Sequence, residues 1–358
     1  MSVCTPNAAV LSTTLAITAI AAGLLGSSDA DSGAATFDIG ARAPSAAISS
    51  KDSNGPDSLP DQLAAGGLRI LRLDDSLIDV YVAAPLSGDK AAIALVLQGS
   101  ECTSVAPGGD RFPLTLPAGV VRMDIEKYGI SPTSQRDGDA CPADYLANNT
   151  VDGRVLDVLI VLAHLRTNAE WWDGRLFVTG ASEGATVAAI VGSLAAETHG
   201  LILINGSIGR PFREGWSDAV ASAVRDGGGS ADDVEAARSS VDNTWVQARA
   251  TPTTELYEGP GNTLRWWRSI IDLRPLNLLQ HIDAPILLMQ SELDQMTPVA
   301  SARAAAERLG ASGAANFIYV ELPGLDHGFR DAEGQPQYGP VLARIDQALA
   351  EQVAAATP

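Results

Sequence analysis

Short apolar runs alternate with segments of helical periodicity along most of the chain, and this alternation strongly restricts the possible folds. The run Ala91–Leu97 has no polar position, as expected for a strand that is covered on both faces. Further strands are predicted at Val120–Ile125, Arg175–Thr179, Leu201–Ile204, Ala284–Met289 and Phe317–Glu321. Helices are predicted at Asn149–Leu165, Thr186–Ala196, Ser301–Leu309 and Val341–Val353. Strands that alternate with helices favour a mostly parallel sheet with helices on both faces, so the sequence predicts an α/β fold.

Two parts of the chain depart from this alternation. Leu68–Leu73 and Leu77–Ala84 alternate in polarity around a short polar turn, which is typical of a β-hairpin. Residues 208–275 separate two predicted strands by far more than an ordinary connection. This stretch contains three consecutive glycines, a helix-like segment at Ala231–Ser239 and the pair Trp266-Trp267. We expect a helical cap over a functional site here, with a peripheral helical insert as the alternative.

Residues 1–30 have the features of an export signal. Ala8–Leu25 is apolar and uncharged, and small residues suited to cleavage follow it. Because Arg42 is the first basic residue, the basic start of an ordinary signal is missing, and a misassigned start or an N-terminal anchor would also explain the segment. The span is short and alanine-rich for a stable membrane helix. We expect a signal peptide, a flexible lead-in at residues 31–60, and a secreted or periplasmic domain at 61–358.

The cysteine content agrees with export. Cys4 would leave with the signal, so Cys102 and Cys141 would remain as an even pair. Such a pair tends to oxidise outside the cytosol, and we therefore predict a disulfide. Two unrelated buried thiols are the alternative.

The charge balance limits the partners of the protein. A formal net charge of −19 leaves little basic surface to neutralise phosphates, which argues against nucleic acid as a partner. It also argues against docking on anionic lipid. The four histidines are scattered without ligand spacing, so no metal or other cofactor is implied.

The predicted strand ending at Thr179 leads into Gly180-Ala181-Ser182-Glu183-Gly184, and an alanine-rich helix follows. Gly-x-Ser-x-Gly between a strand and a helix is the pattern of a nucleophile elbow, in which a tight turn lifts the serine hydroxyl above the sheet. The glycines permit unusual backbone angles and close approach of neighbouring chain. The five-residue pattern alone is weak, so the case for Ser182 as a nucleophile depends on the rest of the chain.

A serine nucleophile needs a histidine base and a carboxylate that orients it, in the order serine, acid, histidine. Of the four histidines, only His327 follows both Ser182 and a carboxylate at the end of a strand. Asp294 comes after the strand at Ala284–Met289, in the turn before a helix, and is the preferred acid. Glu292 is the second candidate.

The oxyanion of an acyl-transfer reaction needs backbone N–H donors. The residue after the nucleophile, Glu183, supplies one, and the loop after Ala91–Leu97 supplies the other. Gly99 in this loop allows close approach, so we assign the second donor to Ser100.

These motifs resemble the α/β-hydrolase superfamily, near its dienelactone-hydrolase and prolyl-oligopeptidase-like branch, over roughly residues 65–355. The resemblance lies in the Gly180–Gly184 elbow, the Asp294–Pro298 turn and the Gly324–Phe329 loop. It implies an α/β-hydrolase fold, a triad of Ser182, Asp294 and His327, and hydrolysis of esters, amides or related acyl bonds through an acyl-enzyme. It does not identify the substrate.

The acidic and aromatic residues near this site each have two possible roles. Glu101 and Glu183 flank the predicted oxyanion site, and each either bonds to the loop or receives a cationic group of the substrate. Trp266 and Trp267 either line an acyl pocket or pack inside the cap.

We therefore predict a serine hydrolase that acts on a small acyl substrate. The enzymatic alternatives are a serine peptidase and an acyltransferase with the same triad. A binding protein that has kept the fold without activity is the alternative of another class, and the complete triad argues against it.

Overall fold

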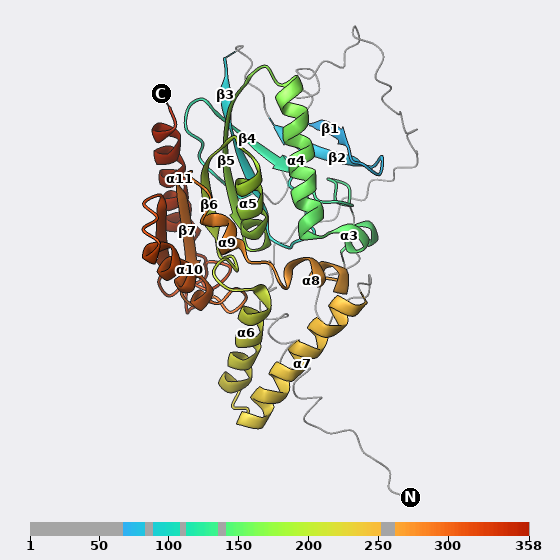
Figure 1. Ribbon diagram of the computed structural model, residues 1–358, viewed down its shortest axis with the longest axis vertical. Helices are drawn as coiled ribbons and strands as arrows, with labels where there is room; N and C mark the ends of the chain where they lie inside the picture. The colour runs from blue at the N-terminus through green and yellow to red at the C-terminus, as the bar shows by residue number, and fades with distance from the viewer. Residues whose placement is uncertain (1–66, 83–88, 108–111, 135–140, 252–261, 358) are drawn as a thin grey trace, which may run out of the picture.

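The structure of the protein is a computed structural model that describes residues 67–82, 89–107, 112–134, 141–251 and 262–357. Its centre is a sheet of eight strands in the order β1-β2-β4-β3-β5-β6-β7-β8 (Figure 1). The pairs β1–β2 and β2–β4 are antiparallel, and the other neighbouring pairs are parallel. The prediction of a mostly parallel sheet with helices is confirmed. The predicted signal peptide and lead-in lie outside the described residues.

The elements have the following bounds. The strands are β1 (Leu68–Leu71), β2 (Leu77–Val82), β3 (Ala91–Leu97), β4 (Val120–Ile125), β5 (Trp172–Ala181), β6 (Thr198–Ile204), β7 (Ile286–Ser291) and β8 (Phe317–Leu322). The helices are α3 (Ala143–Asn148), α4 (Val151–Asn168), α5 (Glu183–Leu194), α6 (Phe212–Asp226), α7 (Ala231–Ala250), α8 (Leu264–Ile270), α9 (Pro275–Leu279), α10 (Val299–Ala311) and α11 (Tyr338–Ala355).

Each face of the sheet is covered by helices, and the central strand β3 is apolar and buried at every position. Along β3, Ile93 and Leu95 belong to the core that α4, α5 and α10 form on one face. Ala92 and Ala94 point to the other face, where α11 packs against β5, β6 and β7. This two-residue alternation is the period of a β-strand. Among the described helices, none combines the length and the apolarity needed to cross a membrane.

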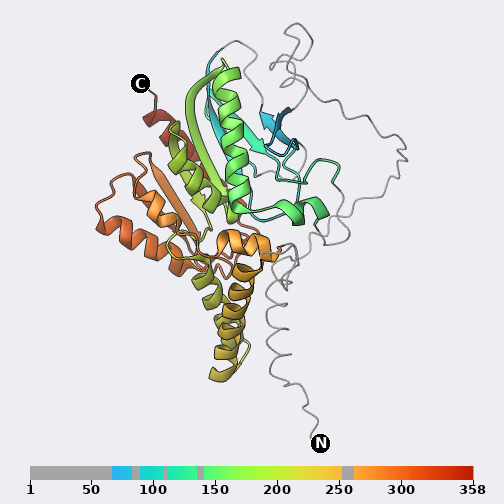
Figure 2. The same ribbon diagram turned by 45° about the vertical axis from the view of Figure 1, so that its right-hand side comes forward.

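The long connection between β6 and β7 is helical. It contains α6, α7, α8 and α9, and α6 pairs with α7. Figures 1 and 2 show this pair extending away from the sheet, while α8 lies beside α4. A capping box at Ser230 begins α7, because the Ser230 hydroxyl accepts from the Asp233 N–H and the Asp233 carboxylate accepts in return.

Candidate active site

Ser182 stands at the junction of β5 and α5, in a turn that only small neighbours permit. Its backbone has φ 55° and ψ −121°, a conformation that costs energy in a non-glycine residue. A Cβ atom at Gly180 would lie 2.1 Å from the Gly184 carbonyl oxygen, and one at Gly184 would lie 2.2 Å from that of Leu97. The two glycines of the motif are therefore required by the close approach of backbone on both sides.

The structure brings Ser182, His327 and Asp294 together from three different connections of the sheet. Ser182 Oγ lies 3.2 Å from His327 Nε2, and His327 Nδ1 lies 2.8 Å from Asp294 Oδ2. This series of contacts can pass the serine proton to the imidazole and hold the resulting cation against a carboxylate.

The Asp294 carboxylate is buried and surrounded by hydrogen-bond donors. Its Oδ1 accepts from the backbone N–H groups of Met296 and Thr297, each at 2.8 Å. Its Oδ2 accepts from the Thr297 hydroxyl at 2.8 Å and from the Gln290 amide at 2.9 Å. These bonds favour the observed orientation of the carboxylate toward His327, because turning it away would leave buried donors unpaired.

The environment of His327 changes its basicity. Burial disfavours the charged imidazole, but the charge of Asp294 and the hydrogen bond to it outweigh this effect. Glu101 and Asp326 add smaller contributions of the same sign, and the pKa of His327 is raised above its ordinary value.

Asn205, just after β6, links the acid loop to the histidine loop. Its side-chain amide donates to the His327 carbonyl oxygen at 3.0 Å and to the Ser291 hydroxyl at 3.1 Å. Its side-chain oxygen accepts from the Ser291 N–H at 2.8 Å, and its own carbonyl accepts from the Thr297 hydroxyl at 2.8 Å. Asn205 adopts a left-handed backbone with φ 46°, which asparagine tolerates better than most residues.

Glu292, the second candidate for the acid, bonds a backbone group instead of the imidazole. Its carboxylate accepts from the Gly324 N–H at 2.9 Å, at the start of the loop that carries His327. The imidazole of His327 bonds Asp294 instead, and among the described residues it forms no hydrogen bond with Glu292.

The two predicted oxyanion donors come from adjacent pieces of chain. The start of α5 packs directly on the end of β3, because the Gly184 Cα faces the carbonyls of Leu97 and Gln98. Among the described residues, neither the Ser100 N–H nor the Glu183 N–H donates a hydrogen bond.

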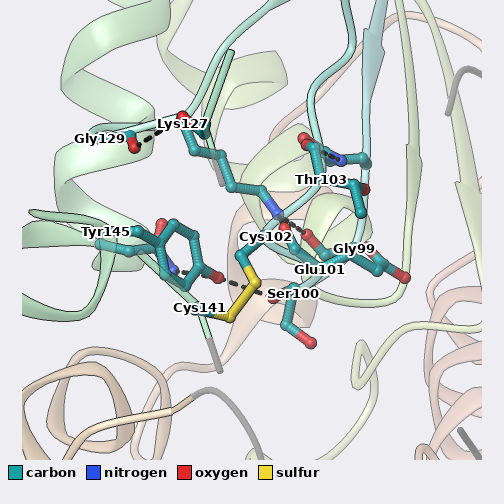
Figure 3. Close-up of a disulfide and its surroundings, with 12 residues drawn as sticks. Gly99, Ser100, Glu101, Cys102, Thr103, Lys127, Gly129, Cys141 and Tyr145 are labelled. Atoms are coloured by element: carbon teal, nitrogen blue, oxygen red, sulfur yellow. Dashed lines mark hydrogen bonds between the residues drawn. A yellow bond between two sulfur atoms is a disulfide. The ribbon is translucent and has the colours of Figure 1, made fainter. Parts of the chain in front are cut away.

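A disulfide closes the loop that carries Ser100. The sulfur atoms of Cys102 and Cys141 are bonded, as predicted, and span 39 residues of sequence. Figure 3 shows this bond beside Ser100 and Tyr145. It joins the loop to the segment just before α3.

The Glu183 side chain is buried and paired. It forms an ion pair with Arg154 of α4, and both side chains are almost fully covered. Its second oxygen accepts from the Trp266 indole N–H at 2.5 Å. Of the two predictions for Glu183, this arrangement corresponds to a structural bond rather than to a free carboxylate facing substrate.

Trp266 and Trp267 lie in an aromatic cluster at the base of the insertion. Their ring centroids are 4.7 Å apart in an edge-to-face arrangement, and both side chains are buried. The cluster also contains Phe212, Trp216 and Trp245. Trp266 and Trp267 therefore pack against α6 and α7, in agreement with the alternative that they pack inside the cap.

Glu101, in contrast, is exposed and lies near the triad. Its carboxylate oxygens lie over Gly99, where an added Cβ would meet one of them at 2.8 Å. Its charge contributes to the raised pKa of His327.

Several residues around the site carry no signal in a short sequence motif. Asn205, Lys127, Arg154 and Tyr145 belong to no short motif, and their contacts lie far away in the sequence. One signal was present for Arg154, which stands on the apolar side of its predicted helix, three residues after Val151. A buried arginine requires a partner, so its position on that face indicated an internal ion pair. Within the described part of the chain, no cluster of His, Cys, Asp and Glu is arranged to hold a metal ion.

Comparison with known proteins addresses the fold. No protein-family model matches the sequence, and no curated protein matches it. An acylaminoacyl peptidase of Pyrococcus horikoshii superposes with a TM-score of 0.51 and 16% identity, over 78% of this chain and 39% of that one. Est1E from Butyrivibrio proteoclasticus gives a TM-score of 0.49 and 13% identity, over 81% and 99% of the two chains. A proline iminopeptidase of Mycobacterium smegmatis gives 0.49 and 17%, over 81% and 100%.

At these identities the comparison concerns architecture alone. By its architecture, the chain has an α/β-hydrolase fold.

Proposed function

We propose that the protein is a serine hydrolase that cleaves an ester or related acyl bond through an acyl-enzyme on Ser182. The observation that carries this proposal is the hydrogen-bonded series from Ser182 through His327 to Asp294. A neutral imidazole next to the hydroxyl is the base that an unactivated serine needs.

The proposed reaction has two acyl-transfer steps. The Ser182 oxygen attacks the carbonyl carbon while its proton moves to His327 Nε2, and the Ser100 and Glu183 N–H groups receive the oxyanion. The tetrahedral intermediate collapses, the bond to the leaving group breaks, and His327 protonates that group. Water then attacks the acyl-enzyme with His327 again as the base, which releases the acid and restores Ser182.

The first experiment is labelling with a fluorophosphonate probe. The serine oxygen displaces fluoride from phosphorus, so we expect one adduct, on the peptide that contains Ser182, in folded protein. Ser182→Ala is expected to give no adduct, and so is protein unfolded in urea before labelling. The measurement is the intact mass followed by peptide mapping, and an unlabelled folded protein would exclude the serine-hydrolase function.

The peptidase and acyltransferase alternatives use the same adduct and differ in the next step. A panel of acyl esters and aminoacyl amides separates esterase from peptidase by the relative kcat/KM. Added alcohol acceptors detect transfer, because the acyl group then appears in a new ester rather than in the free acid.

We further propose that residues 208–275 act as a cap and that the protein is secreted or periplasmic. The bond from Trp266 of α8 to Glu183 supports the first point, because it joins the insertion to the elbow. The disulfide supports the second, because such bonds persist in oxidising compartments.

A second prediction concerns the substrate preference. The exposed Glu101 carboxylate near His327 favours substrates with a positive group. A pair of unit charges about 4 Å apart in water attracts by roughly 1 kcal/mol, which corresponds to about fivefold in kcat/KM. Glu101→Gln is therefore expected to lower kcat/KM by about that factor for a p-nitrophenyl ester with a terminal trimethylammonium group.

The matched neutral substrate is the tert-butyl isostere of that ester, and its kcat/KM is expected to change little. The same variant is expected to move the acid limb of the pH profile to lower pH, since a negative neighbour of His327 is removed. Equal losses on both esters would exclude Glu101 as a selector.

A further inference from the structure

The backbone carbonyls after β3 are held from one side by buried donors. The Gln98 carbonyl accepts from Arg154 Nη2 at 2.9 Å. The Gly99 carbonyl accepts from Lys127 Nζ at 2.6 Å and from Arg154 Nη1 at 3.3 Å. Both cations come from segments behind the loop, Lys127 from just after β4 and Arg154 from α4.

The next two carbonyls are held in the same manner. The Ser100 carbonyl accepts from the Tyr145 hydroxyl at 2.7 Å, and the Glu101 carbonyl accepts from Lys127 Nζ. Figure 3 shows the Lys127 side chain reaching the loop at Gly99 and Glu101. Four consecutive carbonyls therefore have a side-chain donor, and Lys127 bonds two of them.

The direction of these carbonyls fixes the direction of the N–H groups. Every peptide bond among the described residues is trans, and the C=O and N–H of a trans peptide point in opposite directions. The Gly99 carbonyl and the Ser100 N–H belong to one peptide unit. Since Lys127 holds the carbonyl end of this unit, the Ser100 N–H points away from Lys127, and it has no acceptor among the described residues.

The charges behind the loop also act on this peptide unit. Lys127 and Arg154 are both buried, with 2% and 7% exposure, and supply two positive charges. Glu183 is the buried carboxylate that pairs with Arg154, and no carboxylate of the described residues forms an ion pair with Lys127. A cation on the carbonyl side draws electron density along the peptide and makes its N–H a stronger donor, and the effect is larger away from water.

We propose that Lys127 is a positioning residue for acyl transfer, which orients and polarises the Gly99–Ser100 peptide so that its N–H stabilises the oxyanion. This inference rests on the proposed function. Lys127 does not touch the substrate and acts through the peptide that it holds.

The protonation of Lys127 gives this role a measurable signature. Burial, together with the charge of Arg154, lowers the pKa of Lys127 to about 7. Glu183, Glu101 and Glu126 oppose this shift, and the Tyr145 ring lies 5.7 Å from the ammonium. The polarising charge is therefore lost as the pH rises through this value, and the acylation rate is expected to fall on the alkaline side. The fall in the acylation rate at low pH is expected from protonation of His327, which must be neutral to act as the base.

The test measures the rate of fluorophosphonate labelling of Ser182 from about pH 5 to 9, which brackets both groups. Lys127→Met removes the charge and the donor at similar length. We expect its labelling rate to fall about 10- to 100-fold, somewhat less than the loss of a direct oxyanion donor. With p-nitrophenyl butyrate, kcat is expected to fall while KM stays within about twofold. The control is Lys90→Met, the same substitution at an exposed lysine, and its profile should match the wild type.

Lys127→Arg keeps a cation at every accessible pH. We expect it to label faster than Lys127→Met and to lose the alkaline fall of the wild type. If Lys127→Met does not fold, the wild-type and Lys127→Arg profiles decide the question. A folded wild type that labels without an alkaline fall overturns the inference, and so does a Lys127→Met variant that labels at the wild-type rate. A wild type without any adduct overturns the proposed function itself.

Discussion

Replacement of either Ser182 or His327 by alanine is expected to lower kcat about 10⁶-fold on the ester that the wild type hydrolyses fastest. The double variant is expected to be no slower than either single variant, because the two residues act as one unit in proton transfer. Asp294→Asn is expected to cost about 10⁴-fold, since an amide at this position favours the wrong imidazole tautomer. The measurement is steady-state kinetics on protein whose folding has been checked by circular dichroism.

Glu292→Gln is the matched control for the acid. Glu292 bonds the Gly324 N–H rather than His327, and an amide oxygen can accept the same bond. It should therefore keep activity within about tenfold of the wild type, far above the expected Asp294→Asn variant. A larger loss in Glu292→Gln than in Asp294→Asn would assign Glu292 as the acid. If the fold-losses in kcat of Ser182→Ala and His327→Ala multiplied in the double variant, this would contradict a proton-transfer step shared by the two residues.

Arg154→Met is expected to be the most destabilising single change in the charged network, by about 3–5 kcal/mol of unfolding free energy. It leaves the buried Glu183 carboxylate without its cation, and it removes a donor from the Gln98 carbonyl. Methionine has nearly the helix propensity of arginine, so the loss reports on the interaction rather than on α4 itself. Urea unfolding measures it.

The double variant Arg154→Met with Glu183→Gln is expected to recover most of this loss, because the uncompensated charge is gone. Arg166→Met is the control, since Arg166 lies on the same helix but forms a partly exposed pair with Glu197. Its urea midpoint should stay nearly unchanged, because solvent screens such pairs. If the double variant lost as much unfolding free energy as the two single variants added together, Arg154 and Glu183 would not be coupled.

The sequence predicts strands best where both ends are apolar. The bounds of β3 and β4 match the prediction residue for residue. β3 has no polar position, and the two polar residues of β4 lie between apolar ends. β5 begins earlier than predicted, at Trp172, since a left-handed Gly174 lets the strand continue through a polar stretch.

The insertion was harder to predict. α7 extends to Ala250, well beyond the predicted segment that ended at Ser239, because a few buried residues on one face suffice to keep it helical. The predictions named neither α6 nor α8, whose apolar residues gain a partner only when the aromatic cluster of Trp216 and Trp267 forms.

The sequence singles out Ser182, Asp294 and His327 as a candidate triad because each follows a strand in a fixed order along the chain. It does not single out the residues that hold them. Lys127 and Asn205 act through backbone carbonyls and amides of other loops, and such contacts leave no spacing pattern in one sequence. They depend on which strand ends the fold brings together.

The position of Asn205 has a consequence for how the active site begins its cycle. One side chain just after β6 bonds both the last residue of β7 and the backbone of His327, so the end of β7 and the loop after β8 are held together before any substrate arrives. Such preorganisation is completed during folding. The binding energy of the substrate is then not needed to assemble the site, and it can instead orient and distort the substrate at Ser182.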